Sequence, residues 1–128
     1  MTHHEKQRLF INVEEWGGVN RYITWQLDIL PMIWQYYDFS KLEERFIMLV
    51  CMQYDNAHES GRDPIKLSYT DIAKIINCSV EGAKKAVGMV LDSKLILIKD
   101  TRKGRAKTQY LPNVPYIHKQ LKKYLKLS

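Results

Sequence analysis

Residues 66–111 read KLSYTDIAKIINCSVEGAKKAVGMVLDSKLILIKDTRKGRAKTQYL, and this stretch decides the fold. Ser68 and Asp71 give a capping signal for one short helix, and Ser79 caps a second helix directly after a tight turn. An apolar run at 95–98 predicts a β-strand, and residues 107–111 return as its partner after a glycine-containing turn, which together predict a β-hairpin. The predicted order is therefore helix, turn, helix, hairpin.

Apolar residues recur at helical spacing in both short helices and predict their buried faces. The expected core positions are Ile72, Ala73 and Ile76 in the first helix and Ala83, Val87, Val90 and Leu91 in the second.

A longer helix is predicted before this stretch. Ser40 and Glu43 have the spacing of a capping box, and the helix should run to about Ala57. Its centre, residues 46–52, is apolar on every side, so it must be covered on more than one face. We expect the aromatic N-terminal region or a partner subunit to supply part of that cover.

The two ends of the chain complete the predicted organisation. Residues 1–39 form an aromatic extension packed on the core, with short strands at 10–13 and 22–27 and a short helix from Pro31 to about Tyr37. Residues 40–112 form the central part, and residues 113–128 form a basic amphipathic helix. The predicted fold class is mainly α with a small antiparallel β-hairpin (α+β), as one compact domain overall.

Charge is distributed unevenly along the 128 residues, whose net charge is +6. Residues 1–83 hold 8 Lys/Arg and 12 Asp/Glu, a net charge of −4, whereas residues 84–128 hold 12 and 2, a net charge of +10. This asymmetry favours a polyanionic partner for the second part over simple solvation of surface helices.

The sequence also argues against several classes of protein. No apolar run approaches the ~20 residues of a membrane span, and the N-terminus lacks the apolar segment of a signal peptide. A cytoplasmic, non-membrane protein is therefore expected. Cys51 and Cys78 lie within apolar patterns, which favours reduced core thiols over a disulfide.

The central part resembles the winged helix-turn-helix superfamily, and more narrowly the helix-turn-helix domains of plasmid and phage replication-type proteins. The resemblance covers roughly residues 40–111. It is carried by Leu67-Ser68-Tyr69, Asp71-Ile72-Ala73, Cys78-Ser79, Leu95-Ile96 and Gly104-Arg105.

Three positions depart from the pattern of that superfamily. Gly82 stands where a short polar or β-branched residue is usual, and Gly88 lies in the same helix. Lys94 replaces the glycine that normally ends this helix, and it is expected to adopt a left-handed conformation at some cost. These departures weaken base reading by the second helix more than they weaken phosphate binding.

The resemblance implies that the second helix enters the major groove of double-stranded DNA while the first abuts the backbone. Lys84 and Lys85 would neutralise phosphates or donate to guanine. Glu81 could accept from cytosine, although a favourable charge in the first helical turn is the more ordinary role. The expected DNA contacts from the two helices are Tyr69, Thr70, Ser79, Val80, Glu81, Gly82, Lys84 and Lys85.

The predicted hairpin tip is the stronger electrostatic signal. Four cations gather around Gly104 without an acid among them: Arg102, Lys103, Arg105 and Lys107. Cations are common on solvated loops, but this density beside a helix-turn-helix favours contact with a phosphate row or an A·T minor groove.

Catalysis finds little support, because the four histidines are scattered and no metal-ligand spacing or phosphate-binding loop occurs. No catalytic residue, metal or cofactor is expected. The last helix should pack on the protein's own core, and a homodimer or another protein partner, through this helix or the aromatic segment, is the alternative.

Two hypotheses follow from the sequence. The first is a non-catalytic DNA-binding protein of a plasmid, phage or other mobile element, which acts at a defined site in replication, conjugative transfer or transcription regulation. The second is a protein-interaction or scaffold module of a replication or transfer complex, in which the basic surface is incidental.

Overall fold

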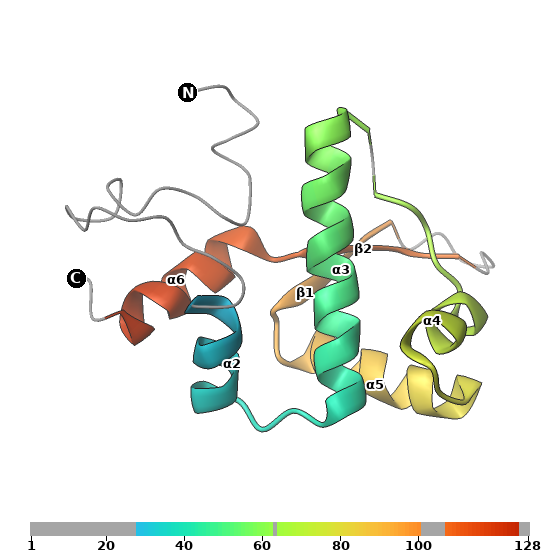
Figure 1. Ribbon diagram of the computed structural model, residues 1–128, viewed down its shortest axis with the longest axis horizontal. Coiled ribbons are helices and arrows are strands. Elements are labelled where there is room, and N and C mark those ends of the chain that lie inside the picture. Colours follow the sequence, from blue (N-terminus) through green and yellow to red (C-terminus); the bar gives the residue numbers. More distant parts are fainter. Residues whose placement is uncertain (1–27, 63, 101–106, 126–128) are drawn as a thin grey trace. The chain divides into compact units, whose positions relative to one another are not determined.

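The computed structural model describes residues 28–62, 64–100 and 107–125 (Figure 1). Within these residues the protein is mainly helical with one two-stranded antiparallel sheet, which confirms the α+β class. The elements are α2 (Leu30–Tyr36), α3 (Lys41–Ser60), α4 (Tyr69–Ile76), α5 (Val80–Asp92), β1 (Ile96–Asp100), β2 (Gln109–Pro112) and α6 (Val114–Tyr124). The strands expected at 10–13 and 22–27 and the turn at 101–106 lie outside the described residues.

The chain divides into two compact units, of which one holds α2 and α6 and the other spans residues 39–113. In the first unit, the rings of Tyr36 and Tyr124 meet edge to face at 5.9 Å between centroids. The predicted apolar face of the last helix is confirmed, because Ile117 and Leu121 are buried. On α2, Met32 and Ile33 are buried, whereas Trp34 is 59% exposed.

Helix α3 begins as its sequence predicts. The backbone N–H of Ser40 donates to Glu43 Oε1 at 3.2 Å, and that of Glu43 donates to Ser40 Oγ at 3.3 Å. The predicted end at about Ala57 was too early, since the helix continues to Ser60. Gly61 then adopts a φ of 67°, and the N–H of Arg62 donates to the carbonyl of Ala57 at 2.9 Å. This glycine-based cap ends the helix.

The helix–turn–helix arrangement of α4 and α5 forms as predicted. Asn77 ends α4 with a left-handed φ of 63°, and Ser79 Oγ accepts from the N–H of Gly82 at 3.0 Å. The buried face of α4 matches the prediction. On α5, Ala86 is buried and Leu91 is only half-buried. The buried stripe follows the 83, 86, 87, 90 spacing, which leaves Leu91 at its edge.

The hairpin follows the predicted order with shifted boundaries. β1 pairs with β2 in antiparallel register, with Ile96 opposite Pro112 and Ile98 opposite Tyr110. Leu67 adds an isolated bridge to Thr108, with backbone hydrogen bonds of 2.8 and 2.9 Å. The segment between α3 and α4 is therefore tied to the chain that enters β2.

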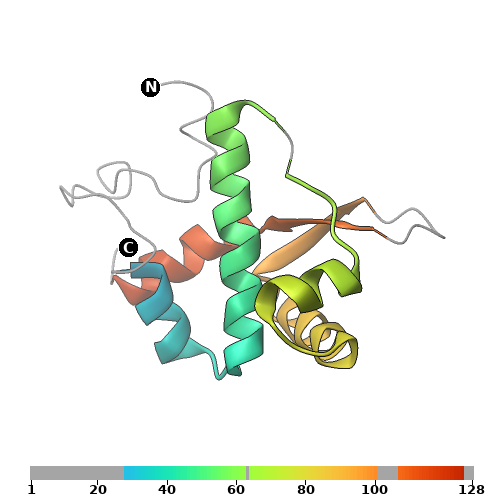
Figure 2. The same ribbon diagram turned by 45° about the vertical axis from the view of Figure 1, so that its right-hand side comes forward.

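The core of the second unit surrounds α3, which packs against α4, α5 and β2 (Figure 2). Phe46 is fully buried and meets the ring of Tyr110 edge to face at 5.2 Å. Ile47 and Cys51, on another side of the helix, are also buried, which confirms that α3 is covered on more than one face. Met52 nevertheless remains 52% exposed.

The cysteines are both free, as the sequence predicts. Cys51 is buried, and its burial raises the pKa of the thiol. Cys78 is half-buried at the turn between α4 and α5. The sequence predicted a core thiol at this position, and the structure places it at the edge of the core.

Candidate nucleic-acid interface

The N-terminal part of α5 presents most of the side chains expected to contact DNA. Ser79, Val80 and Lys85 are exposed at its start, and the Glu81 side chain is 87% exposed. Gly82 differs from these residues because a Cβ there would lie 3.2 Å from Ser79 Oγ and 3.6 Å from Leu42 Cδ1. The tight contact is therefore with the capping oxygen at the start of α5, whereas the distance to Leu42 of α3 is an ordinary van der Waals contact.

Tyr69 and Lys84 bring α4 and α5 together on this surface. Lys84 Nζ lies 5.8 Å from the centroid of the Tyr69 ring, a cation–π contact. The same ammonium lies 3.7 Å from Glu81 Oε1. Lys84 is therefore held between an aromatic face and a carboxylate, while Tyr69 and Thr70 remain exposed at the start of α4.

Lys107 reaches the same end of α4 from the chain that leads into β2. Its Nζ lies 3.6 Å from Asp71 Oδ2. The predicted tip contained no acid within its own sequence, so this partner was not foreseen. We call the surface formed by the following residues the basic surface: Tyr69, Thr70, Ser79, Val80, Glu81, Gly82, Lys84, Lys85 and Lys107.

Asp71 is fixed by more than this ion pair. Its Oδ2 accepts from the N–H of Ser68 at 2.9 Å, and its own N–H donates to Ser68 Oγ at 3.1 Å, which completes a capping box. The Ser68 backbone N–H, then the Ser68 hydroxyl, and then Lys107 lower the pKa of this carboxyl. The Asp71 carboxylate is therefore ionised at neutral pH.

The remaining predicted residues of the hairpin tip lie outside the described residues: Arg102, Lys103, Gly104 and Arg105. The structure does show how the hairpin is attached to α5. Lys94 has a φ of 69°, which confirms the left-handed conformation expected there. The Asn113 side-chain amide donates to the Lys94 carbonyl at 3.0 Å and so links the start and the end of the hairpin.

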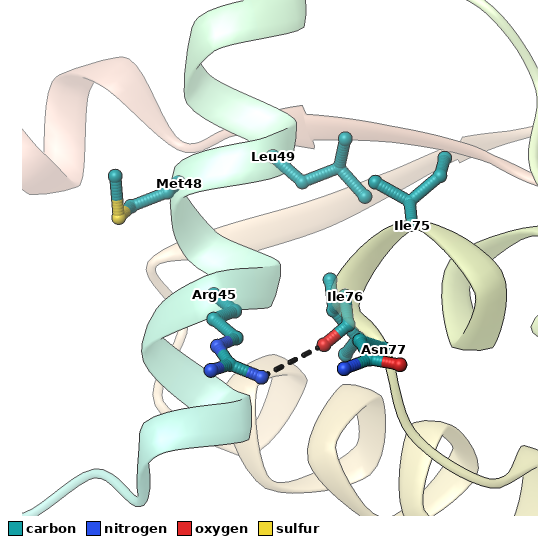
Figure 3. A pocket seen from close by; sticks show the side chains of 6 residues that line it. All are labelled: Arg45, Met48, Leu49, Ile75, Ile76 and Asn77. Carbon is teal, nitrogen blue, oxygen red and sulfur yellow. Dashed lines mark hydrogen bonds between the residues drawn. The ribbon is translucent and has the colours of Figure 1, made fainter.

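An apolar depression of about 340 Å³ lies between α3 and the end of α4 (Figure 3). Met48, Leu49 and Ile75 line it, and Arg45 Nη1 donates to the carbonyl of Ile76 at 3.0 Å. This bond satisfies a carbonyl at the C-terminus of α4. Sequence reasoning missed the depression, although the apolar circumference of α3 was a signal for it.

Within residues 28–62, 64–100 and 107–125, no three His, Cys, Asp or Glu side chains come together in a way that could hold a metal ion. Nor does any helix among the described residues combine the length and the apolar character of a membrane span. Tyr37 has its pKa raised to about 12 by burial and by its hydrogen bond with Tyr116.

Comparisons with protein-family models, curated proteins and solved structures gave no match.

Proposed function

We propose that this protein is a non-catalytic, winged-helix protein that binds double-stranded DNA through the basic surface. The observation that carries the proposal is the convergence of α4, α5 and the chain entering β2. Lys84 contacts Tyr69, and Lys107 contacts Asp71 at the same end of α4. One duplex can meet all three segments, with α5 in the major groove and the hairpin on the neighbouring backbone.

The order of elements supports the winged-helix part of the proposal. Residues 39–113 run as helix, bridging residue, helix, turn, helix, strand and strand. The bridge from Leu67 to Thr108 fixes the chain that returns from the hairpin tip beside the segment that leads into α4. Cations at the tip of such a hairpin extend the positive surface away from the core, toward the phosphates that dominate protein–DNA affinity.

Base readout is the smaller part of the proposed interaction. The first turn of α5 offers the small Ser79, the apolar Val80 and the acidic Glu81, none of which gives a bidentate contact to guanine. Phosphate contacts from Lys84, Lys85 and the hairpin cations therefore supply most of the affinity.

The salt dependence of duplex binding tests the proposal. If about five phosphates are neutralised per monomer, log K should fall with log salt concentration at a slope of about −4 to −5. Fluorescence anisotropy with a labelled 20-bp duplex would measure this slope. A flat dependence, or no duplex binding at low salt, would contradict DNA binding.

The proposal also includes a biological setting, namely that the protein belongs to a plasmid, phage or other mobile element. It rests on the resemblance of residues 40–111 to replication-type helix-turn-helix domains. A role in replication, conjugative transfer or transcription regulation predicts a defined site in DNA near the gene. Footprinting of the flanking DNA tests it, and uniform protection without a preferred site would contradict it.

A second candidate function is that of a protein-interaction module with the same fold. The apolar depression between α3 and α4 favours it, because Ile75 is 51% exposed beside half-buried Met48 and Leu49. Duplex binding by the unaltered chain separates the two candidates, because an interaction module with an incidental basic surface need not bind DNA. Ile75→Asp should leave DNA affinity unchanged if the basic surface is the functional one, and a loss of affinity would implicate the depression.

A further inference from the structure

Two lysines of the basic surface already have acidic partners within the protein. Lys107 Nζ lies 3.6 Å from Asp71 Oδ2, and Lys84 Nζ lies 3.7 Å from Glu81 Oε1. The two lysine side chains are 61% and 50% exposed, so a phosphate can still reach either ammonium. A phosphate that does so must share the ammonium with a carboxylate or displace that carboxylate.

We propose that Asp71 and Glu81 compete with DNA phosphates for Lys107 and Lys84 and thereby limit binding to DNA of arbitrary sequence. This inference rests on the proposed function, because it concerns the affinity of the same surface. The two acids would lower affinity for any duplex, and only a site with compensating base contacts would overcome that effect.

Asp71 is well placed for this competition because it cannot easily move away. Its carboxylate accepts from the backbone of Ser68 and lies in the first turn of α4, where the helix dipole favours a negative charge. A phosphate that approaches Lys107 therefore meets a fixed anion at the position that a DNA phosphate would otherwise occupy.

Glu81 acts at the end of α5 that is expected to enter the groove. The Glu81 side chain is highly exposed. The Lys84 ammonium lies close to both the Tyr69 ring and the Glu81 carboxylate. Cytosine can donate to a glutamate in the major groove, whereas a phosphate only repels it. Glu81 therefore opposes backbone contact without opposing every base sequence equally.

Charge-removing variants test the inference. Asp71→Asn removes the charge but keeps a carbonyl oxygen that can accept from the Ser68 N–H. Glu81→Gln removes the charge of a residue that takes no part in the capping box of Ser68 and Asp71. Binding of each variant to a 20-bp duplex of arbitrary sequence would be measured by anisotropy from 50 to 300 mM NaCl. Each variant should bind about 3- to 10-fold more tightly at about 0.1 M salt, with a slope steeper by up to ~0.9.

Asp92→Asn is the matched control, because it removes one negative charge from the last turn of the same helix. Asp92 lies ~16 Å along the helix axis from Glu81 at the usual rise per residue. Its substitution should change affinity less than about twofold, since that separation exceeds the Debye length at this salt concentration. An equal gain in all three variants would overturn the pairing argument.

A double-mutant cycle separates pairing from a structural effect. In a Lys107→Gln background, Asp71→Asn should no longer tighten binding, because the ammonium for which Asp71 and the phosphate compete is absent. The same gain with and without Lys107 would overturn the role of Asp71. Unchanged affinity in both Asp71→Asn and Glu81→Gln, with unchanged thermal unfolding, would overturn the proposal as a whole. Absence of binding by the unaltered chain would instead refute the proposed function itself.

Discussion

Replacement of Gly88 by alanine should stabilise the protein. Gly88 lies in the interior of α5, is exposed, and has no atom within 4 Å of the position that a Cβ would take. Alanine is favoured over glycine inside a helix by about 0.5–1 kcal/mol, because the unfolded chain loses less conformational freedom on folding. No packing cost opposes that gain at this site.

Gly82→Ala provides the comparison within the same helix. Its new Cβ would lie 3.2 Å from the capping oxygen of Ser79, which is closer than an ordinary van der Waals contact. The propensity gain should therefore be cancelled or reversed by displacement of the cap, which is itself worth ~1 kcal/mol.

Urea unfolding followed by circular dichroism measures both effects. Gly88→Ala should raise the free energy of unfolding by about 0.5–1 kcal/mol without a change in m-value. Gly82→Ala should leave it unchanged or lower it. If Gly82→Ala stabilised the protein as much as Gly88→Ala does, the expected conflict between a Cβ at residue 82 and the Ser79 cap would be refuted.

Three further changes have defined outcomes. Arg102→Ala with Arg105→Ala should weaken binding to all duplexes alike and make the salt slope shallower by about 2, as measured by anisotropy over a salt series. Val80→Ala should alter base preference in a selection from random duplexes, while affinity for non-specific DNA stays within about twofold; an unchanged preference would exclude Val80 from readout. Lys94→Gly should raise the free energy of unfolding by about 0.5–1 kcal/mol because Lys94 has a φ of 69°; a loss of stability would show that its side chain contributes more than this strain costs.

Local chemistry explains why much of the fold was predictable from sequence. The capping boxes of Ser40 with Glu43 and Ser68 with Asp71 each involve residues three positions apart, so their spacing is visible in the sequence. The left-handed conformation of Lys94 was predicted in a different way, from the resemblance to a superfamily in which a glycine ends this helix.

Contacts between distant segments explain most of what was not predicted. The pairing of Lys107 with Asp71, the bridge from Leu67 to Thr108 and the bond from Arg45 to α4 depend on how elements pack. Propensity and periodicity carry no information about such partners. The end of α3 is different, because Gly61, which directly follows the last helical residue, is a capping signal that is visible in the sequence.

The central claim is that DNA binds the surface shared by α4, α5 and the hairpin. A titration of the isotope-labelled protein with a duplex, followed through its backbone amide NMR signals, tests this claim most directly. The largest changes should occur at residues 69–71, at 79–85 and around Lys107, and should be small at Arg45, Met48 and Ile75. Changes concentrated at the depression between α3 and α4, or no changes at low salt, would contradict the claim.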